Sequence, residues 1–186
     1  MRARLMDATI ECLVERGFGG TSTTLVSELA GVSRGAQLHH FPTKNDLVVA
    51  AVEHLTEVRG AELAAAAAAV PQGARRTRDV LRMLGDHFAS PVFTAALELW
   101  VAARTDRALL AAVAPLELRI GRETHRMTVD LLGADESMPG VRELVQATLD
   151  LVRGLGLAAT ISDDTRRRNR ILDQWARTLD NALAAA

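Results

Sequence analysis

Side chains that can donate hydrogen bonds or bind metal gather in one short stretch of the chain, AGVSRGAQLHHFPTKNDL, residues 30–47. It contains Arg34, Gln37 and two adjacent histidines, His39 and His40. Neighbouring residues of a helix point about 100° apart, so the two imidazoles cannot comfortably share one ion. We therefore expect no metal site here. The remaining chemistry of this stretch is hydrogen bonding to a partner. For that, the rest of the chain must hold the stretch at the surface.

The elements that position this stretch have clear boundary signals. A first helix is predicted over about residues 2–16, and Gly17 ends it. Ser22 or Thr23 then offers a side-chain oxygen that can cap a second helix. Gly31 is expected to end this second helix, because glycine adopts the left-handed conformation without steric cost.

A third, very short helix is predicted directly after the turn. Ser33 can cap its start, and Pro42 prevents it from continuing beyond Phe41. Thr43 and Asp46 then form a capping-box pattern, which predicts the start of a fourth helix. The stretch therefore contains one complete short helix between two capped boundaries.

Two short helices joined by Gly31-Val32-Ser33 fit the description of a helix-turn-helix motif. A helix of about seven residues is unstable alone in water, so it must be docked against its neighbours. Its outer side can then enter a DNA major groove about 12 Å wide, while the preceding helix crosses the phosphate backbone. The alternative interpretation is a helical corner inside a globular core.

From Gly17 to Leu47 the chain resembles the N-terminal domain of the TetR family of transcriptional regulators. The resemblance lies in GF, TS, the AGVS turn with a glycine after it, HHF, and Lys44 followed by Leu47. It implies a DNA-binding domain in the first quarter of the chain. It also implies that the remainder is a divergent helical domain that binds a small effector and pairs two subunits.

The resemblance also implies roles for individual residues of the DNA-binding surface. Phosphates are expected to contact Ser22, Thr24, His40 and Lys44, and base edges are expected to contact Arg34, Ala36, Gln37 and His39. Arginine can bond guanine O6 and N7 together, and glutamine can bond adenine N6 and N7 in the same way. For Gln37 a second interpretation stays open, in which it is a buried structural amide.

The chain departs from the family pattern at one pair of residues. Gln37-Leu38 stands where the family commonly has Leu-Tyr, with the leucine inside and the tyrosine hydroxyl on a phosphate. That phosphate contact is therefore missing. The first fifty residues carry five basic and five acidic side chains. DNA binding must consequently rest on a few well-placed donors rather than on a broad basic field.

The fourth helix has no breaker before Pro71 and contains six consecutive alanines, residues 64–69. It would be roughly 35 to 40 Å long, enough to connect two bodies. Helical periodicity continues to the C-terminus, and Pro115 is expected to kink a helix over about residues 106–132 or to mark its start. We predict an all-α protein with a three-helix DNA-binding domain, residues 1–46, and a helical effector-binding and dimerisation domain, residues 47–186.

Two further sites are predicted in the second domain. An apolar effector pocket with few polar groups is expected at Met83, His87, Phe88, Phe93, Leu97, Trp100 and Arg104. Such side chains at helical spacing are also common in ordinary cores. The last two predicted helices have wide apolar stripes, which favour a four-helix dimer interface at Leu144, Leu151, Leu155, Ile171, Trp175 and Leu179.

Composition excludes several classes of protein. Only 3% of the 186 residues are aromatic, tyrosine is absent, and the single Cys12 cannot form an intramolecular disulfide. Without a signal-peptide pattern or a long apolar run, we expect a cytoplasmic protein with no membrane partner. Paired metal-ligand, nucleophile and phosphate-loop motifs are missing, so we expect no enzyme activity, no metal and no cofactor.

These observations combine into one hypothesis. The sequence predicts a ligand-responsive transcriptional repressor that binds double-stranded, near-palindromic operator DNA as a homodimer and responds to an unidentified small molecule. The alternative is a helical interaction or ligand-binding protein of the same shape that has lost specific DNA binding, which the missing tyrosine and the neutral charge favour.

Overall fold

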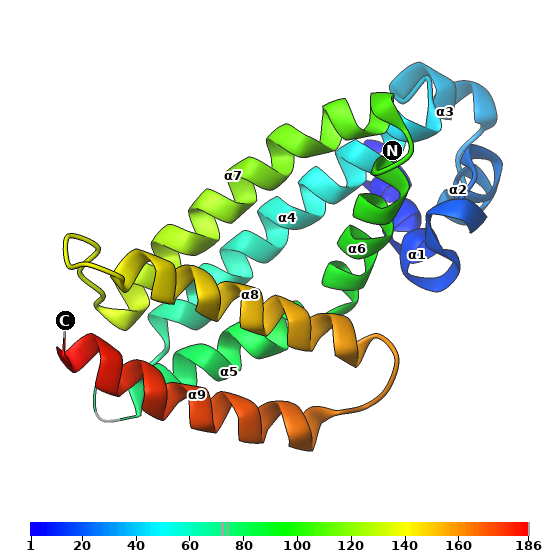
Figure 1. The fold of residues 1–186 in the computed structure, drawn as a ribbon. Helices are drawn as coiled ribbons and strands as arrows, with labels where there is room; N and C mark the ends of the chain where they lie inside the picture. Colours follow the sequence, from blue (N-terminus) through cyan, green and yellow to red (C-terminus); the bar gives the residue numbers. More distant parts are fainter. Residues whose placement is uncertain (72, 74, 186) are drawn as a thin grey trace. The chain divides into compact units, whose positions relative to one another are not determined.

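The chain folds into α-helices, and the predicted all-α class is confirmed (Figure 1). The computed structural model describes residues 1–71, 73 and 75–185, and this part of the chain contains no strand. In order, the helices are α1 (Arg2–Gly20), α2 (Thr23–Ala30), α3 (Arg34–His40), α4 (Lys44–Ala68), α5 (Arg76–Phe88), α6 (Pro91–Ala103), α7 (Arg107–Leu132), α8 (Val141–Ala159) and α9 (Thr165–Ala185).

The helices form two compact units. The first comprises residues 1–60 and 91–119, which include α1 to α3, most of α4, and α6. The second comprises residues 61–90 and 120 to the C-terminus, which include α5, α8 and α9. Both α4 and α7 contribute to each unit. The predicted domain boundary between residues 46 and 47 stays a prediction.

Gly17 interrupts α1, as the sequence predicts. Its backbone has φ 64° and ψ 178°, a conformation that only glycine adopts without strain. The break turns the backbone so that the amide of Phe18 donates a hydrogen bond to Glu98 Oε2 of α6, at 3.2 Å. Helices α1 and α6 also pack against each other. The first helix is therefore held on α6 at the point where it breaks.

The boundaries of α2 and α3 agree with the predicted caps. The hydroxyl of Ser22 accepts a hydrogen bond from the amide of Leu25 at 3.2 Å, and that of Ser33 accepts one from Ala36 at 3.3 Å. Gly31 ends α2 in the left-handed conformation, with φ 60° and ψ 40°. Local hydrogen bonds and one glycine thus define the turn between the two helices.

The start of α4 is a reciprocal capping box. The amide of Thr43 donates to Asp46 Oδ2, and the amide of Asp46 donates to Thr43 Oγ1, each at 3.1 Å. The side-chain amide of the neighbouring Asn45 donates to Asp106 Oδ2 at 3.3 Å. Asp106 also accepts from the backbone of Leu109 at the start of α7, and these bonds hold its pKa below the ordinary value. The first turn of α4 is therefore tied to the first turn of α7.

We call α1, α2 and α3 the head. Its interior is a single apolar cluster that also takes in the first turns of α4. The buried members are Leu5, Met6, Ala8, Cys12, Val26, Ala30, Val32, Phe41, Leu47 and Ala51. Cys12 is one of these packing residues, and burial raises the pKa of its thiol. The short helices are stable because they share this core.

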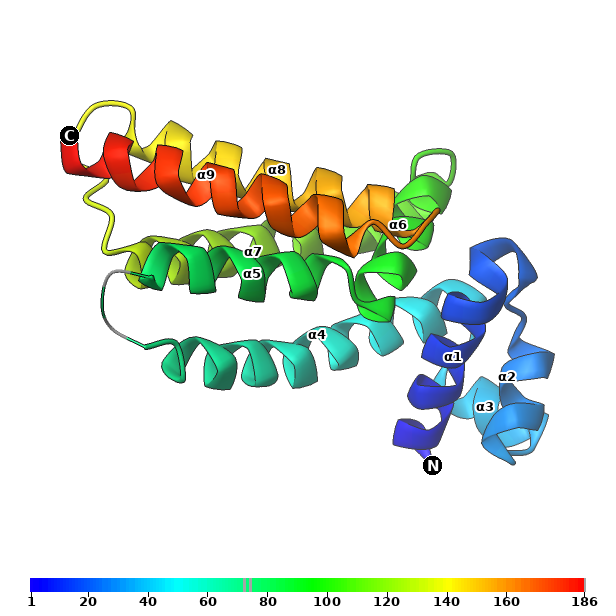
Figure 2. The same ribbon diagram turned by 90° about the horizontal axis from the view of Figure 1, so that it is seen from below.

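In the second unit, α5 packs against both α8 and α9, and α8 and α9 run side by side (Figures 1 and 2). Arg78 of α5 donates two hydrogen bonds to the carboxylate of Asp173 of α9, at 2.7 and 3.0 Å. Between α8 and α9, the indole N–H of Trp175 of α9 donates to Thr148 Oγ1 of α8 at 3.0 Å. Polar contacts therefore fix the rotation of α9 relative to both partners.

Pro115 lies inside α7, which begins at Arg107. The alternative that Pro115 marks the start of this helix is therefore wrong. Asp106 explains the difference, because it accepts the hydrogen bond of the Leu109 amide and so caps a helix that starts earlier. A proline in the interior removes one backbone hydrogen bond, and the flanking turns tolerate that loss.

The break at Gly17 leads to the first prediction. A Cβ atom at this residue would lie 2.6 Å from Glu98 Oε2, and its backbone conformation disfavours any side chain. Gly17→Ala should therefore lower the free energy of unfolding by about 2 to 3 kcal/mol in urea titrations. Adding Glu98→Ala removes the close contact, but it leaves the backbone strain and also removes the hydrogen bond of the Phe18 amide, so it should not restore the stability of the wild type.

The matched control is Gly19→Ala. A Cβ atom there would meet nothing within 4 Å, so its stability should stay close to that of the wild type. Equal effects of the two alanine substitutions would show that the chain is not held at Gly17 as described.

Candidate nucleic-acid interface

Local backbone hydrogen bonds close the turn between α2 and α3. The amide of Gly31 donates to Glu28 O at 3.1 Å, and the amide of Val32 donates to Ser27 O at 2.9 Å. Val32 is buried, so the turn is also fixed by packing on the core of the head. This geometry carries the chain from α2 directly into the capped start of α3.

Helix α3 has seven residues, of which one side chain is fully buried and most of the others are exposed. We call its exposed residues the outer face: Arg34, Gly35, Leu38, His39 and His40. The residues that bracket the helix, Val32 and Phe41, are both buried. The helix is therefore docked at both ends, and its outer face points to solvent.

Most of the residues predicted to bind DNA are accessible. The exposed ones are Ser22, Thr24, Arg34, His39 and His40, and Ala36 and Lys44 are half-buried. Ser22 keeps its hydroxyl hydrogen available while its oxygen caps α2. All the residues predicted to contact DNA except Gln37 are thus at least partly accessible, on the head and at the start of α4. Their roles at bases and phosphates stay predictions.

Gln37 requires a correction. Its side chain is completely buried, and its amide nitrogen donates to the carbonyl of Phe41 at 2.6 Å. In this conformation it cannot reach a base edge, so the predicted base contact is wrong and the buried structural amide is right. The bond joins the middle of α3 to the residue that ends it. Within the described residues, Gln37 Oε1 has no hydrogen-bond partner.

Lys44 is less free than the sequence suggests. Its ammonium group donates a hydrogen bond to the carbonyl of Phe18 and lies 3.9 Å from the centroid of the Phe18 ring. Burial lowers the pKa of this lysine. One of its three N–H donors is used in this way, which leaves two for an outside acceptor. Lys44 therefore also fixes the end of α1 against the start of α4.

The two adjacent histidines are exposed at the end of α3. The ring centroids of His39 and His40 are 5.5 Å apart in an edge-to-face arrangement, and both side chains are exposed. Across the described residues, no group of three or more histidine, cysteine or carboxylate side chains is placed to hold a metal ion. Both imidazoles are instead available for hydrogen bonds outside the protein.

Two features of this surface are not evident from residue types alone. Leu38 is 43% exposed although it is a large apolar residue in the middle of the outer face. Arg2, at the start of α1, places its guanidinium 5.6 Å from the centroid of the Phe41 ring and so adds a cation near the end of α3. In the sequence, the exposure of Leu38 is signalled by the exchanged order of polar and apolar residues at Gln37 and Leu38.

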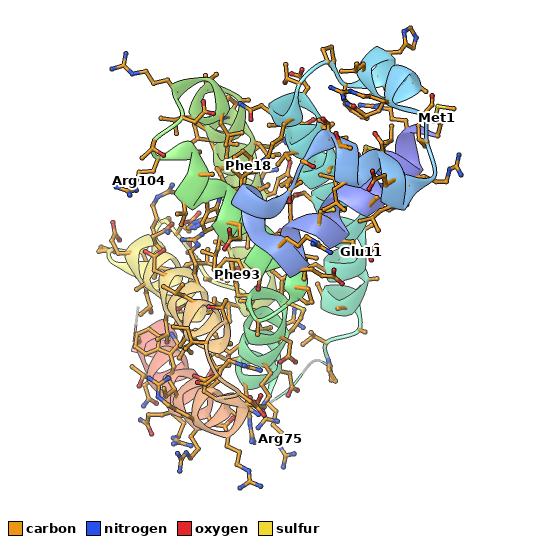
Figure 3. All side chains as sticks on the ribbon, turned by 90° about the vertical axis from the view of Figure 1, so that its right-hand side faces the viewer. Met1, Glu11, Phe18, Arg75, Phe93 and Arg104 are labelled. Carbon is orange, nitrogen blue, oxygen red and sulfur yellow. The ribbon has the colours of Figure 1, made fainter. Side chains whose placement is uncertain are left out.

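The predicted effector residues fall into two groups. Met83, His87 and Phe88 lie on α5 in the second unit, whereas Phe93, Leu97, Trp100 and Arg104 come from α6 and its end in the first unit. Phe93 is buried and meets Trp100 edge to face, with ring centroids 5.7 Å apart. Arg104 is exposed and lies just beyond α6 (Figure 3). A common cavity for these residues stays a prediction.

The residues predicted for the dimer interface also fall into two groups, buried and accessible. Leu155 and Leu179 are buried within their own unit, so their assignment to a subunit interface is wrong. They face inward because α8 and α9 each present one apolar side to α5. Leu144 is half-buried.

The remaining three, Leu151, Ile171 and Trp175, line an open hollow of about 620 Å³ on α8 and α9, together with Arg167, Arg170 and Gln174. The surface of this hollow is mostly apolar. It leaves an apolar strip of the second unit open to solvent.

The head and the start of α4 match a known family model. Residues 5–51 match the model described as "Bacterial regulatory proteins, tetR family". The chain is also similar to the HTH-type transcriptional regulator CymR of Pseudomonas putida, with 29% identity over 91% of this chain and 84% of CymR. The match spans both units, so the similarity is not limited to the head.

Solved structures are similar over nearly the whole chain. A transcriptional regulator from Rhodococcus sp. Rha1 shares the fold, with a TM-score of 0.78, 24% identity, and coverage of 98% of this chain and 97% of that one. The multidrug binding protein EbrR, solved in complex with imidazole, has a TM-score of 0.61 and 27% identity, and the match covers 94% of this chain and 93% of EbrR. In the described ranges of our chain, no helix is long and apolar enough to span a membrane.

The burial of Gln37 leads to the second prediction. Gln37→Leu removes a buried oxygen without a partner, but it also leaves the Phe41 carbonyl without the side-chain donor that closes α3, and each effect is worth about 1 to 3 kcal/mol. The two effects oppose each other, so the free energy of unfolding should change by less than about 1 kcal/mol in urea titrations. Affinity for duplex DNA, measured by fluorescence anisotropy, should not change, because the side chain does not belong to the outer face. A tenfold or larger loss of affinity would return Gln37 to the base-contacting residues.

Proposed function

We propose that the chain is a bacterial transcriptional regulator of the TetR family, which its head and its similarity to CymR support, and that it acts as a homodimeric, ligand-responsive repressor of a near-palindromic operator. The observation that carries this proposal is the outer face of α3, which is docked at both ends and exposes Arg34, His39 and His40. In a helix-turn-helix protein, this is the face that enters the major groove.

The proposed division of contacts follows from the positions of the side chains. Arg34, at the start of α3, is the candidate for bidentate bonding to guanine, which contributes about 1 to 3 kcal/mol of discrimination. His39 and Ala36 are the further candidates at base edges. Ser22 and Thr24 at the start of α2, His40 at the end of α3 and Lys44 are the candidates at phosphates, which fix the orientation of the head.

A two-fold operator needs a two-fold protein, and we propose that α8 and α9 supply the subunit contact. The hollow lined by Leu151, Ile171 and Trp175 supports this, because it leaves apolar area open on the surface of the second unit. Two copies related by a two-fold axis would cover each other's strip and form a four-helix interface. The same dimer sets the distance between the two outer faces at about one turn of DNA.

We further propose that a small ligand controls DNA binding. EbrR, the similar structure named above, is a multidrug binding protein. In our chain, α6 carries both the aromatic pair Phe93 and Trp100 and the carboxylate of Glu98 that bonds Phe18 in the head. A ligand placed against the aromatic pair would act on the helix that holds α1. Its effect can be no larger than its difference in affinity for the two states. A cytoplasmic location follows from access to operator DNA.

The primary test is a fluorescence titration of the full chain against the DNA that flanks its own gene. The regulator should bind with nanomolar affinity that weakens as salt rises from about 50 to 200 mM. Absence of binding at low salt would overturn the proposal and support the alternative of a helical ligand-binding protein without specific DNA binding.

The third prediction separates base contacts from phosphate contacts. Arg34→Ala should weaken operator binding by about ten- to hundredfold while affecting an unrelated duplex much less, so base preference relaxes. Lys44→Met keeps the aliphatic stem, and it should weaken both duplexes alike and reduce the salt slope by about one. Thermal unfolding of each variant controls for the loss of the Lys44 contact with Phe18. If both variants behave in the same way, the division of contacts is wrong.

The fourth prediction concerns the dimer. Ile171→Glu places a charge in the apolar hollow, so it should shift the protein to the monomer in light scattering and weaken operator binding at least tenfold. The control is Ile161→Glu, because Ile161 is 87% exposed and lies between α8 and α9, outside the hollow. A dimer that persists in Ile171→Glu would exclude this face.

A further inference from the structure

Leu38 occupies an unusual place on the outer face of α3. It is 43% exposed and does not belong to the apolar core of the head. Arg34 lies four residues before it, on the same side of the helix, and His39 follows it. Single exposed leucines are common and need no explanation. This one, however, is the only large apolar side chain among the five residues of the outer face.

The position of Leu38 follows from the burial of its neighbour. Gln37 takes the inward position of this turn and is fixed there by its bond to the Phe41 carbonyl. Because successive residues of a helix point about 100° apart, the next side chain is turned outward. Leu38 therefore cannot retreat into the core without breaking the hydrogen bond that closes α3.

Leucine has neither a donor nor an acceptor, so it can bond neither to a phosphate nor to a polar base edge. In the major groove, the one strongly apolar group is the 5-methyl group of thymine. The other three bases present only donors, acceptors and ring carbon there. An exposed leucine on the face that enters the groove is therefore matched to thymine and to no other base.

Gly35 allows the approach that such a contact needs. It lies on the same side of α3 as Leu38, three residues earlier, and a Cβ atom at this residue would meet nothing within 4 Å. The backbone of α3 can thus come close to the floor of the groove beside Leu38. The side chain then reaches the base edges without a bulky neighbour in front of it.

Resting on the proposed function, we propose that Leu38 is a specificity-determining residue that packs on the methyl group of one thymine in each operator half-site. Arg34 and Leu38 are four residues apart, about 6 Å along the helix, and base pairs are stacked about 3.4 Å apart. The thymine therefore lies one or two base pairs from the guanine that Arg34 contacts. The half-site contains a guanine and a thymine at this spacing.

The test removes the methyl group from DNA without changing any hydrogen bond. The full-length protein is first used to select its preferred site from a pool of randomised duplexes. Each thymine of the selected site is then replaced in turn by deoxyuridine, and affinities are measured by fluorescence anisotropy. At one thymine per half-site, the wild type should lose about fourfold in affinity, the ratio that corresponds to burial of one methyl group.

The same duplexes are then titrated with Leu38→Ala. Because this residue is exposed, the variant should fold normally, and the ratio of its affinities for the thymine and deoxyuridine duplexes should fall to about one. The matched control is Leu29→Ala, since Leu29 is another exposed leucine, at 48%, on α2 rather than α3. This control should keep the fourfold ratio of the wild type.

The outcomes separate the two proposals. If no duplex is enriched and no salt-sensitive binding occurs, the proposed function fails and this inference fails with it. If a site is bound but deoxyuridine is tolerated everywhere, or Leu38→Ala keeps the wild-type ratio, only the role of Leu38 is overturned. Loss of the ratio in Leu38→Ala alone, one or two base pairs from the Arg34-dependent guanine, supports it.

Discussion

The interface depends on how a helix of seven residues is kept folded. Such a helix forms too few internal hydrogen bonds to offset the cost of ordering its backbone, so its stability must come from contacts outside itself. Ser33 satisfies an amide at its start, and the buried amide of Gln37 bonds the carbonyl of Phe41 at its end. With Val32 and Phe41 inserted in the core, α3 is fixed in rotation as well as in place.

The same contacts determine which side chains remain available. Once Gln37 is inside, Arg34 and Leu38 are outside as a consequence of helical geometry. Lys44, bonded to the carbonyl of Phe18, joins the end of α1 to the start of α4, and Glu98 of α6 accepts a hydrogen bond from the amide of the same residue. The head is thus connected to α6 through Phe18 as well as through the packing of α1 on α6. The proposed ligand control would act through these contacts.

Sequence reasoning succeeded where the structure is decided locally. The caps at Ser22, Ser33 and Thr43 and the break at Gly17 depend on residues within one turn, so their positions could be predicted. It failed where the rotation of a helix about its axis decides burial. Leu155 and Leu151 lie four residues apart on α8, yet the first is buried in its own unit and the second lines the open hollow. An apolar stripe predicts that a side is covered, but not by which partner.

The balance of charge in the head determines how its binding energy must be distributed. With equal numbers of acidic and basic side chains in the first fifty residues, few cations of the head are available to release counterions from DNA. Under the proposed function, non-specific binding would be weak. Contacts that do not depend on salt, such as the proposed packing of Leu38 on a base methyl group, would then supply a larger share of the affinity. A neutral head with an exposed leucine would gain selectivity at the cost of general attraction to DNA.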